Sequence, residues 1–156
     1  MSWQAELNEI ALRKQLAQEL GGADKVAKHK AAGKLTVRER IAGLLDAGTF
    51  QELGSISGFP QYDEHGQLLQ YTPANIVCGM GQINGQTAFV TGDDFTVRGG
   101  ANDGGVAQKF TFAETWARNF KVPFVRLVDG TGGGGSVKQL ETLERTYLPD
   151  VPHFTE

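Results

Sequence analysis

The sequence feature that most constrains the fold is a short apolar run that leads directly into a stretch with almost no side chains. Residues 124–129 read Phe-Val-Arg-Leu-Val-Asp, and residues 130–136 read Gly-Thr-Gly-Gly-Gly-Gly-Ser. A turn built from glycine lets backbone N–H groups approach a ligand oxygen where a Cβ would obstruct it, and a following helix adds its positive end. The pattern therefore predicts strand, turn and helix, with a binding site for an anion or an oxyanion at the turn.

The length of the chain favours one compact domain. The chain has 156 residues, a formal net charge of −3 and a single cysteine, Cys78, inside an apolar run. No basic run is long enough to indicate a nucleic-acid partner. A lone cysteine cannot form a disulfide within the chain, so we expect a buried thiol in a reducing compartment. The sequence contains neither a membrane-spanning apolar stretch nor a signal-peptide pattern, and we expect a soluble protein without a membrane partner.

The first 48 residues predict three helices. Residues 2–20 place apolar side chains near one helical face, and the pair Gly21-Gly22 ends that pattern; the apolar side chains are Trp3, Leu7, Ile10, Ala11 and Ala17. Residues 23–33 carry four basic side chains, which form either a solvated helical face or a phosphate contact; they are Lys25, Lys28, His29 and Lys30.

A capping box begins the third of these helices. The Thr36 hydroxyl and the Glu39 carboxylate are spaced to satisfy each other's backbone N–H groups, and a helix over residues 37–45 follows. We expect its buried side to contain Ile41, Leu44 and Leu45, and we expect Gly48 to end it as a left-handed cap.

Residues 74–128 predict two strands, a helix and a further strand. Residues 76–83 and 86–91 flank Asn84-Gly85, the strongest two-residue hairpin signal, whereas residues 55–71 show only a weak pattern. Val106, Phe110, Ala113 and Ala117 recur at helical spacing up to about residue 119. The apolar run at 124–128 suits a buried strand in a sheet covered by helices, and a last helix is expected over 136–147.

The glycine run also permits other interpretations. Residues 130–135 formally match G-x-G-x-x-G, but the stretch about 20 positions later holds Pro149 and Pro152 and does not read as a buried second strand. A P-loop requires lysine where Ser136 stands. The interpretation of the glycine run as a flexible linker is not excluded by the sequence. A second glycine pair, Gly99-Gly100, is expected at the same edge of the sheet. The preceding Arg98 is either a surface charge or a phosphate ligand.

Four motifs, in this order, resemble the carboxyltransferase (β) subunits of biotin-dependent acyl-CoA carboxylases of the propionyl-CoA and methylcrotonyl-CoA type. They are Lys-Leu-Thr-Val-Arg-Glu-Arg-Ile at 34–41, Leu-Leu-Asp-Ala-Gly-Thr-Phe at 44–50, Gly-Met-Gly-Gln-Ile-Asn-Gly at 79–85 and Asp-Phe-Thr-Val-Arg-Gly-Gly at 94–100. The resemblance covers about residues 33–135.

This resemblance implies an α/β (α+β) fold of the ClpP/crotonase-like type, built from ββα units that form a spiral. Residues 1–156 would be the N-terminal part of the carboxyltransferase N domain, with a helical arm at 1–48 and ββα units at 49–156. The implied reaction moves a carboxyl group from carboxybiotin to the α-carbon of an acyl-CoA. The expected oxyanion donors are the backbone N–H groups of Gly132, Gly133 and Gly134. The expected substrate-binding residues are Gly135, Arg98, Gly99, Gly100, Lys34 and Arg38, with no metal site.

Two departures from the family pattern limit what this chain holds. Where many members have a Ser-Gly-Gly-Ala-Arg turn, this chain has Thr131 followed by four glycines, so any role of that arginine is lost or moved. Family subunits are several hundred residues long, and carboxybiotin would bind mostly to a second domain of a neighbouring subunit. We therefore interpret the chain as a fragment, a truncated product or a piece of a split subunit that is inactive alone.

The implied partners are the remaining half of the subunit, a biotin carboxylase or biotin carrier subunit and further copies of the chain. The implied location is the cytoplasm, or the mitochondrial matrix in a eukaryote. The implied mechanism uses biotin as the acceptor of the α-proton, so no side-chain base is demanded. Asp129, Asp103 and Glu114 are interpreted as loop or helix-surface charges. The alternative function is a non-catalytic acyl-CoA-binding or assembly module of a larger carboxylase complex.

Overall fold

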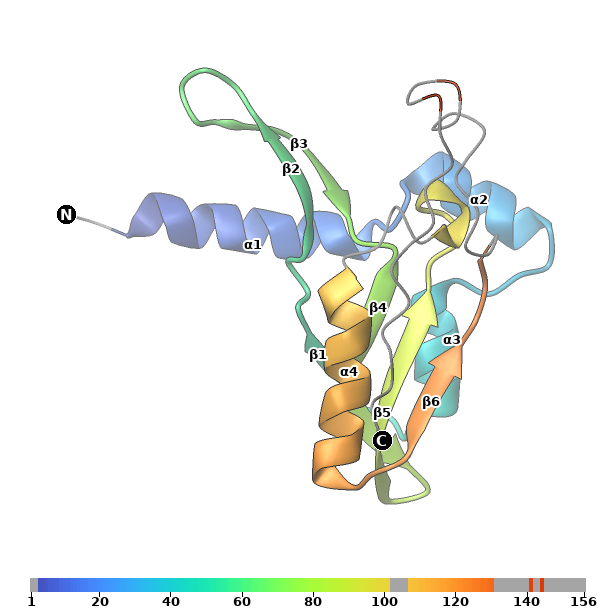
Figure 1. Cartoon of the computed structure of the whole chain (residues 1–156). Coiled ribbons are helices and arrows are strands. Elements are labelled where there is room, and N and C mark those ends of the chain that lie inside the picture. The colour runs from blue at the N-terminus through green and yellow to red at the C-terminus, as the bar shows by residue number, and fades with distance from the viewer. Residues whose placement is uncertain (1–2, 102–106, 131–140, 142–143, 145–156) are drawn as a thin grey trace.

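The computed structural model describes residues 3–101, 107–130, 141 and 144. Its helices are α1 (Gln4–Gln18), α2 (Ala23–Ala31), α3 (Val37–Leu44) and α4 (Ala107–Phe120). Its strands are β1 (Gln51–Leu53), β2 (Gly58–Tyr62), β3 (Leu68–Pro73), β4 (Ile76–Ile83), β5 (Gln86–Asp93) and β6 (Phe124–Leu127). A short 3-10 helix, Arg98–Gly100, follows β5. Figure 1 shows the strands that form the centre of the molecule, with α1 projecting from it.

The main sheet has the strand order β1-β4-β5-β6. β4 and β5 form the antiparallel hairpin that the sequence predicts, and the two turn residues, Asn84 and Gly85, have φ angles of 51° and 77°. Positive φ at both positions is what a tight hairpin turn requires, which explains the Asn-Gly pair. β6 then pairs with β5 in parallel after the α4 crossover, so the predicted order of strand, strand, helix and strand is confirmed.

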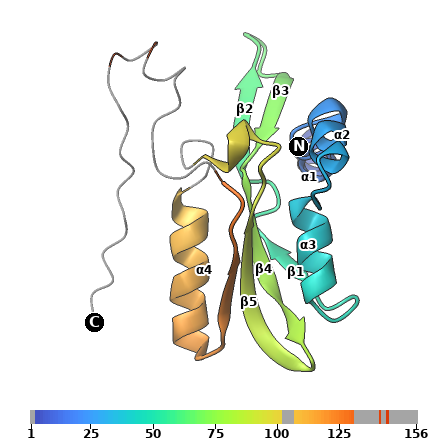
Figure 2. The same ribbon diagram turned by 90° about the vertical axis from the view of Figure 1, so that its right-hand side faces the viewer.

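Helices cover both faces of this sheet. Figure 2 shows α4 on one face and α3 on the other. Ala113 and Ala117 of α4 are almost fully buried against Phe89 and Cys78. Two alanines one helical turn apart let the helix approach the sheet closely, because no larger side chain separates the backbones. On the opposite face, Ile41 of α3 packs in a second apolar cluster that includes Val90 of β5.

Cys78 lies inside the core, as expected. Its side chain faces α4 and its residue surface is 1% exposed. Burial raises the pKa of the Cys78 thiol, because the thiolate form would lose its solvation there. The group is therefore a packing residue in its protonated form.

β6 differs from the expected position. The sequence predicts a strand buried within the sheet, but the structure places β6 at the edge of the described sheet, with side chains that are mostly half-buried. Only β5 is hydrogen-bonded to it among the described residues. A continuous apolar run predicts that the strand is covered, but it does not distinguish a central strand from an edge strand.

The capping box of α3 is confirmed, but its predicted end is wrong. Glu39 N donates to Thr36 Oγ1 over 3.2 Å, and Thr36 N donates to Glu39 Oε2 over 2.9 Å. The helix ends at Leu44 because Leu45 adopts an extended conformation. Gly48 has a φ angle of +76°, but it lies in the following turn, where Thr49 N donates to Asp46 O over 3.1 Å.

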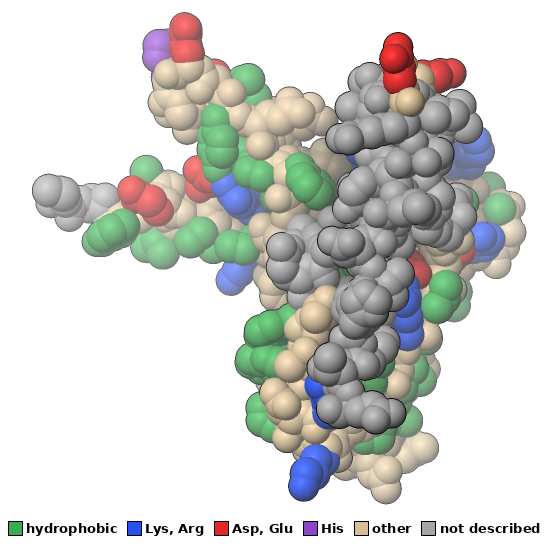
Figure 3. Space-filling model, in the orientation of Figure 1, with side chains coloured by type: hydrophobic (Ala, Val, Ile, Leu, Met, Phe, Trp, Pro, Cys, Tyr) green, Lys and Arg blue, Asp and Glu red, His purple; other side chains and the backbone are tan. Residues whose placement is uncertain are grey.

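The predicted apolar face of α1 is buried only at its C-terminal end, where Ala17 is 3% exposed. Trp3 is 74% exposed and Leu7 is 57% exposed, and Figure 3 shows hydrophobic side chains gathered along one side of this helix. The contact with the hairpin of β2 and β3 is instead made by polar groups. Arg13 donates to Glu9 and to the Tyr62 hydroxyl, and that hydroxyl donates to Glu9 Oε1 over 2.7 Å. Periodicity therefore identified the helix and its buried end but not the polar side that contacts the hairpin.

The hairpin of β2 and β3 falls in the region where the sequence pattern is weak. These two strands form a separate two-stranded sheet, and large side chains such as Phe59 and Leu69 are 46% and 69% exposed. Within this hairpin only the end of β3 is buried, at Tyr71 and Pro73. Most of its length therefore imposes no alternation of apolar and polar residues, and the pattern on which a strand prediction depends is weak.

The first prediction concerns Gly21, which joins α1 to α2. A Cβ at this position would lie 2.0 Å from the backbone oxygen of Thr96, so Gly21→Ala must displace the helical arm from the segment that follows β5. We expect a loss of about 2 kcal/mol or more in the free energy of unfolding, measured by urea denaturation. Gly43→Ala in α3 is the matched control, because nothing lies within 4 Å of its Cβ, and it should stabilise by about 0.5–1 kcal/mol. Equal effects of the two substitutions would contradict this packing.

The second prediction concerns pH. Lys30 and both donors of Thr36 hydrogen-bond to the Glu39 carboxylate, and they lower its pKa from 4.5 to about 2. A carboxyl group with a depressed pKa stabilises the folded state above its unfolded pKa and loses that contribution as the pH falls through its folded pKa. Glu39→Gln should therefore flatten the decline of the unfolding free energy between pH 4.5 and about 2. The prediction fails if the unfolding free energies of the wild type and Glu39→Gln decline equally over this pH range.

Candidate functional site

The candidate site lies where the parallel strands β5 and β6 end, because both carboxyl ends meet at one edge of the sheet. Two glycines make this edge possible. A Cβ at Gly100 would lie 2.5 Å from the backbone oxygen of Asp129, and a Cβ at Gly130 would lie 2.8 Å from the oxygen of Gly100. The first residue of the predicted glycine turn thus lies directly against the second glycine pair, as the sequence predicts for the two segments.

The turn after β5 is a run of residues in the left-handed region. Arg98, Gly99 and Gly100 have φ angles of 52°, 66° and 64°. Glycine adopts this conformation without strain, whereas Arg98 is a non-glycine residue in a sparsely populated region. The Arg98 side chain is exposed at the end of the sheet. All three predicted residues therefore lie at this edge, and Gly99 and Gly100 leave the backbone there without side chains.

Buried polar groups hold this turn in place. Thr96 donates from its backbone N and from its hydroxyl to Asp94 Oδ1, over 2.9 and 2.6 Å. The same hydroxyl accepts from Gly21 N over 2.9 Å, which attaches the helical arm. Burial raises the pKa of the Asp94 carboxyl, while the hydrogen bonds from Thr96 oppose that shift. On the other side, Asn75 Nδ2 donates to Ala101 O over 2.6 Å.

Asp129 is the residue whose role the sequence interpretation missed. It was interpreted as a loop charge, but the structure places the ammonium group of Lys34, the guanidinium of Arg40 and the imidazole of His29 around its carboxylate. Lys34 Nζ lies 3.3 Å from Oδ1, while His29 Nε2 and Arg40 NH1 lie 3.7 and 3.9 Å from Oδ2. The signal in the sequence is its position between β6 and the glycines, at the end of a strand where ligand-binding edges form.

Of the predicted basic residues, Lys34 belongs to this edge. Its ammonium group contacts Asp129 and also lies 4.7 Å from the centre of the Phe95 ring, in a cation–π contact. Phe95 follows β5, so Lys34 joins the helical arm to both strand ends. About half of its side chain is exposed, which leaves it accessible to a ligand.

Arg38 is held elsewhere. Its guanidinium makes two hydrogen bonds to the carboxylate of Glu52, over 2.8 and 3.2 Å, and a third to Ala17 O over 3.3 Å. This pair joins α3 to β1 and to the end of α1. Its role as a substrate ligand stays a prediction, and so do the roles of Gly132, Gly133, Gly134 and Gly135, which lie outside the described residues. The predicted helix over 136–147 also lies outside them, apart from residues 141 and 144.

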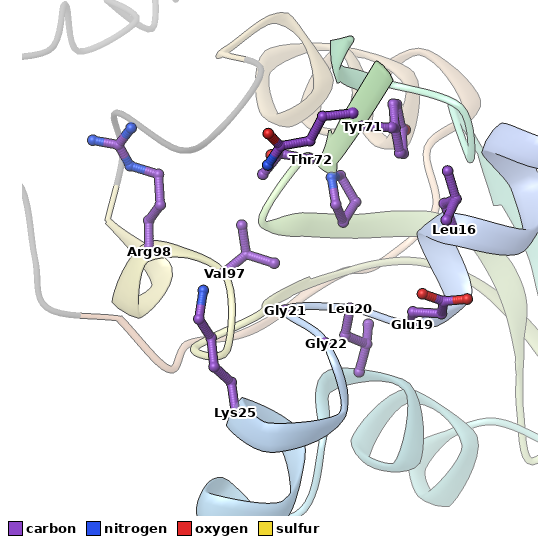
Figure 4. A pocket seen from close by; sticks show the side chains of 12 residues that line it. Leu16, Glu19, Leu20, Gly21, Gly22, Lys25, Tyr71, Thr72, Val97 and Arg98 are labelled. Carbon is purple, nitrogen blue, oxygen red and sulfur yellow. The ribbon is translucent and has the colours of Figure 1, made fainter. Parts of the chain in front are cut away.

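A cleft of about 230 Å³ opens beside this edge, between the start of α2, β3 and the turn after β5. Figure 4 shows Lys25 and Arg98 together on one side of it, and Leu16 and Tyr71 on the other. Gly21 and Gly22 contribute backbone to its wall. Glu19 also lines the cleft, on the side away from Lys25 and Arg98, so the end that could attract an anionic group is the one with the two basic side chains.

Two features of other site classes are missing from the part of the chain that the structure describes. Among those residues, no group of three or more His, Cys, Asp and Glu side chains could hold a metal ion. Likewise, no described helix is long and apolar enough to cross a membrane.

Comparisons with known proteins place this edge in context. The mitochondrial propionyl-CoA carboxylase beta chain of Rattus norvegicus is 35% identical over 141 residues, which cover 88% of this chain and 26% of the rat protein. The mitochondrial methylcrotonoyl-CoA carboxylase beta chain of Dictyostelium discoideum is 32% identical over 137 residues, covering 86% and 22%. The chain spans about a quarter of the length of these relatives.

Solved structures agree on the fold. Transcarboxylase 12S, crystallised with methylmalonyl-coenzyme A and methylmalonic acid, superposes with a TM-score of 0.68 and 26% identity. The match covers 85% of this chain and 26% of the transcarboxylase chain. The crotonase-like fold that the sequence resemblance implies is thus confirmed.

A family model described as the carboxyl transferase domain matches residues 28–146. That range contains Lys34, both strands that end at the candidate edge and the glycines that follow β6. The chain therefore belongs to the carboxyl transferase domain family.

Proposed function

We propose that this chain forms the acyl-CoA side of a carboxyltransferase active site, in a protein that moves a carboxyl group from carboxybiotin to the α-carbon of an acyl-CoA. The observation that carries the proposal is the contact between Gly100 and Gly130. It brings two stretches of backbone without side chains together at the carboxyl ends of parallel strands, where α/β sheets bind ligands. Relatives named as acyl-CoA carboxylase beta chains support the chemistry.

The chemistry requires a donor for a developing oxyanion. Carboxylation of the α-carbon removes an α-proton, which transfers negative charge to the thioester oxygen, and fixed backbone N–H groups stabilise that charge. We assign this role to Gly132, Gly133 and Gly134, which come directly after the edge along the chain. Bound carboxybiotin would release its carboxyl group as CO₂, and the biotin left behind would accept the α-proton before the α-carbon takes up the CO₂. No side-chain base is required at this edge.

The charged groups around the edge fit the remainder of an acyl-CoA. Lys34 contacts Asp129 after β6, and Arg98 and Lys25 line the cleft beside the turn that follows β5. We propose that these groups attract the phosphates of CoA, with Gly99, Gly100 and Gly135 giving the pantetheine arm close access to backbone. Arg38 is the weaker candidate, because binding a phosphate would cost it the bidentate pair with Glu52.

The whole reaction needs parts beyond this chain. We propose a helical arm at 1–48 and ββα units at 49–156 as the N-terminal part of the N domain. The remaining carboxyltransferase segment, a biotin carboxylase or biotin carrier subunit and further copies of the subunit are the proposed partners. For a eukaryotic source, the mitochondrial relatives support a location in the matrix.

The third prediction tests the catalytic role by reconstitution. Co-expression with the carboxyltransferase segment that a relative carries after the matched region should give an assembly that carboxylates propionyl-CoA when free carboxybiotin is supplied. The chain alone should show no turnover, because it spans only about a quarter of the length of these relatives. A stable assembly that binds acyl-CoA without turnover would favour the non-catalytic binding or assembly module instead.

The fourth prediction tests the edge in the chain itself. Gly100→Ala forces a Cβ against Asp129 and Gly130, and we expect it to weaken propionyl-CoA binding by about tenfold in isothermal titration, since small displacements at a binding centre have large effects. Gly85→Ala is the matched control. It has the same positive φ but nothing within 4 Å of its Cβ, at the far end of the β4–β5 hairpin. Equal affinities for the two variants would exclude this edge as the binding site.

A further inference from the structure

Asp129 lies along the chain between the end of β6 and the glycine-rich stretch at 130–135. Its side chain is 21% exposed, although it comes at the end of a strand and before a glycine. Its backbone N donates to Asp93 Oδ2 over 3.3 Å, and Asp93 ends β5. The backbone at this point is therefore attached to the neighbouring strand, just where Gly130 contacts Gly100.

The three side chains that face Asp129 come from three parts of the helical arm. His29 belongs to α2, Lys34 to the link between α2 and α3, and Arg40 to α3. Each has a further attachment. His29 stacks on Phe95 and contacts Leu35 O over 3.1 Å, Lys34 lies over the same ring, and Arg40 NH2 donates to Val128 O over 3.2 Å. The carboxylate is thus the common point of contact for groups that are themselves fixed.

Arg40 shows that this contact matters energetically. Its NH1 atom is buried without a hydrogen-bond partner among the described residues, and Asp129 Oδ2, at 3.9 Å, forms its ion pair. A buried guanidinium nitrogen without a hydrogen bond depends on nearby negative charge. Neutralising Asp129 would leave Arg40 and Lys34 repelling each other across the end of β6.

We propose that Asp129 is a positioning residue: its charge fixes the position of Gly130 relative to the helical arm and to the turn after β5. The effect on ligand binding rests on the proposed function. Asp129 acts through Lys34, Arg40 and the backbone of Gly130, and it does not itself touch the ligand. The cluster of Lys34, Arg40 and Asp129 keeps an excess positive charge, which suits an anionic ligand beside it.

The test compares Asp129→Asn with Glu64→Gln in the full chain. Both substitutions remove one carboxylate charge, but the Glu64 side chain is 87% exposed in the turn between β2 and β3, far from the cationic cluster along the chain. The ligands are propionyl-CoA and free CoA. We expect Asp129→Asn to weaken propionyl-CoA binding by about tenfold and free CoA binding by less than about twofold, since only the acyl thioester reaches the glycine-rich segment. Glu64→Gln should change neither affinity.

A purely structural role gives a different result. If Asp129 serves only stability, both affinities fall together, or the melting temperature falls while the ratio of the two affinities stays constant; either outcome overturns the proposal. The double variant Lys34→Met with Asp129→Asn adds a second check. It should weaken propionyl-CoA binding by clearly less than the product of the two single effects, because the two residues act through one contact. Additive losses would place them in separate roles.

Hydrogen exchange separates this proposal from the proposed function. If the wild-type chain binds no acyl-CoA, the proposed function fails, but the positioning role is still measurable without ligand. Asp129→Asn should speed amide exchange at residues 129 and 130 by about tenfold while the β4–β5 amides keep their protection, because opening there is local. Unchanged exchange at 129 and 130 would overturn the positioning role even if the wild-type chain binds propionyl-CoA.

Discussion

The structure of the candidate edge depends on one close approach of backbone to backbone. Gly100 and Gly130 lie so near each other that a Cβ on either would overlap the opposite main chain. Because β5 and β6 are parallel, their ends must diverge into separate connections, and only residues without side chains let those connections remain in contact. The register Gly92↔Leu127 brings the two strand ends level, so the contact follows directly from the sheet.

The helical arm completes the edge from outside the sheet. Gly21 N attaches the arm to Thr96 after β5, and Lys34 attaches it to Asp129 after β6. Each attachment depends on a group from a different segment, so the arm and both strand ends fix one another. The arm also carries the basic side chains that make the edge attractive to an anion. The helical arm therefore both holds the two strand ends in place and supplies positive charge beside them.

Local patterns in the sequence predicted the elements well. Asn84-Gly85 requires two positive φ angles, and Thr36 with Glu39 forms a reciprocal cap, so each signal is contained within a few residues. The region of β2 and β3 was interpreted only loosely, as short extended pieces around a turn at 64–66, because only the end of β3 is buried. The apolar side of α1 was recognised as a pattern, but most of it is exposed, and Arg13 of this helix instead contacts Tyr62 of β2. A periodic pattern shows that a face is apolar and not what covers it.

What the sequence determined by itself was the set of strands and helices, the two glycine segments and the kind of chemistry they suit, because these depend on backbone conformation and short-range spacing. What only the tertiary structure decided was which charges meet. Asp129 lies 95 positions from Lys34 and was interpreted as a surface charge, whereas Arg38 was expected at the ligand and is paired with Glu52. Ion pairs between distant segments depend on where the folded backbone brings them, and no local pattern records that distance.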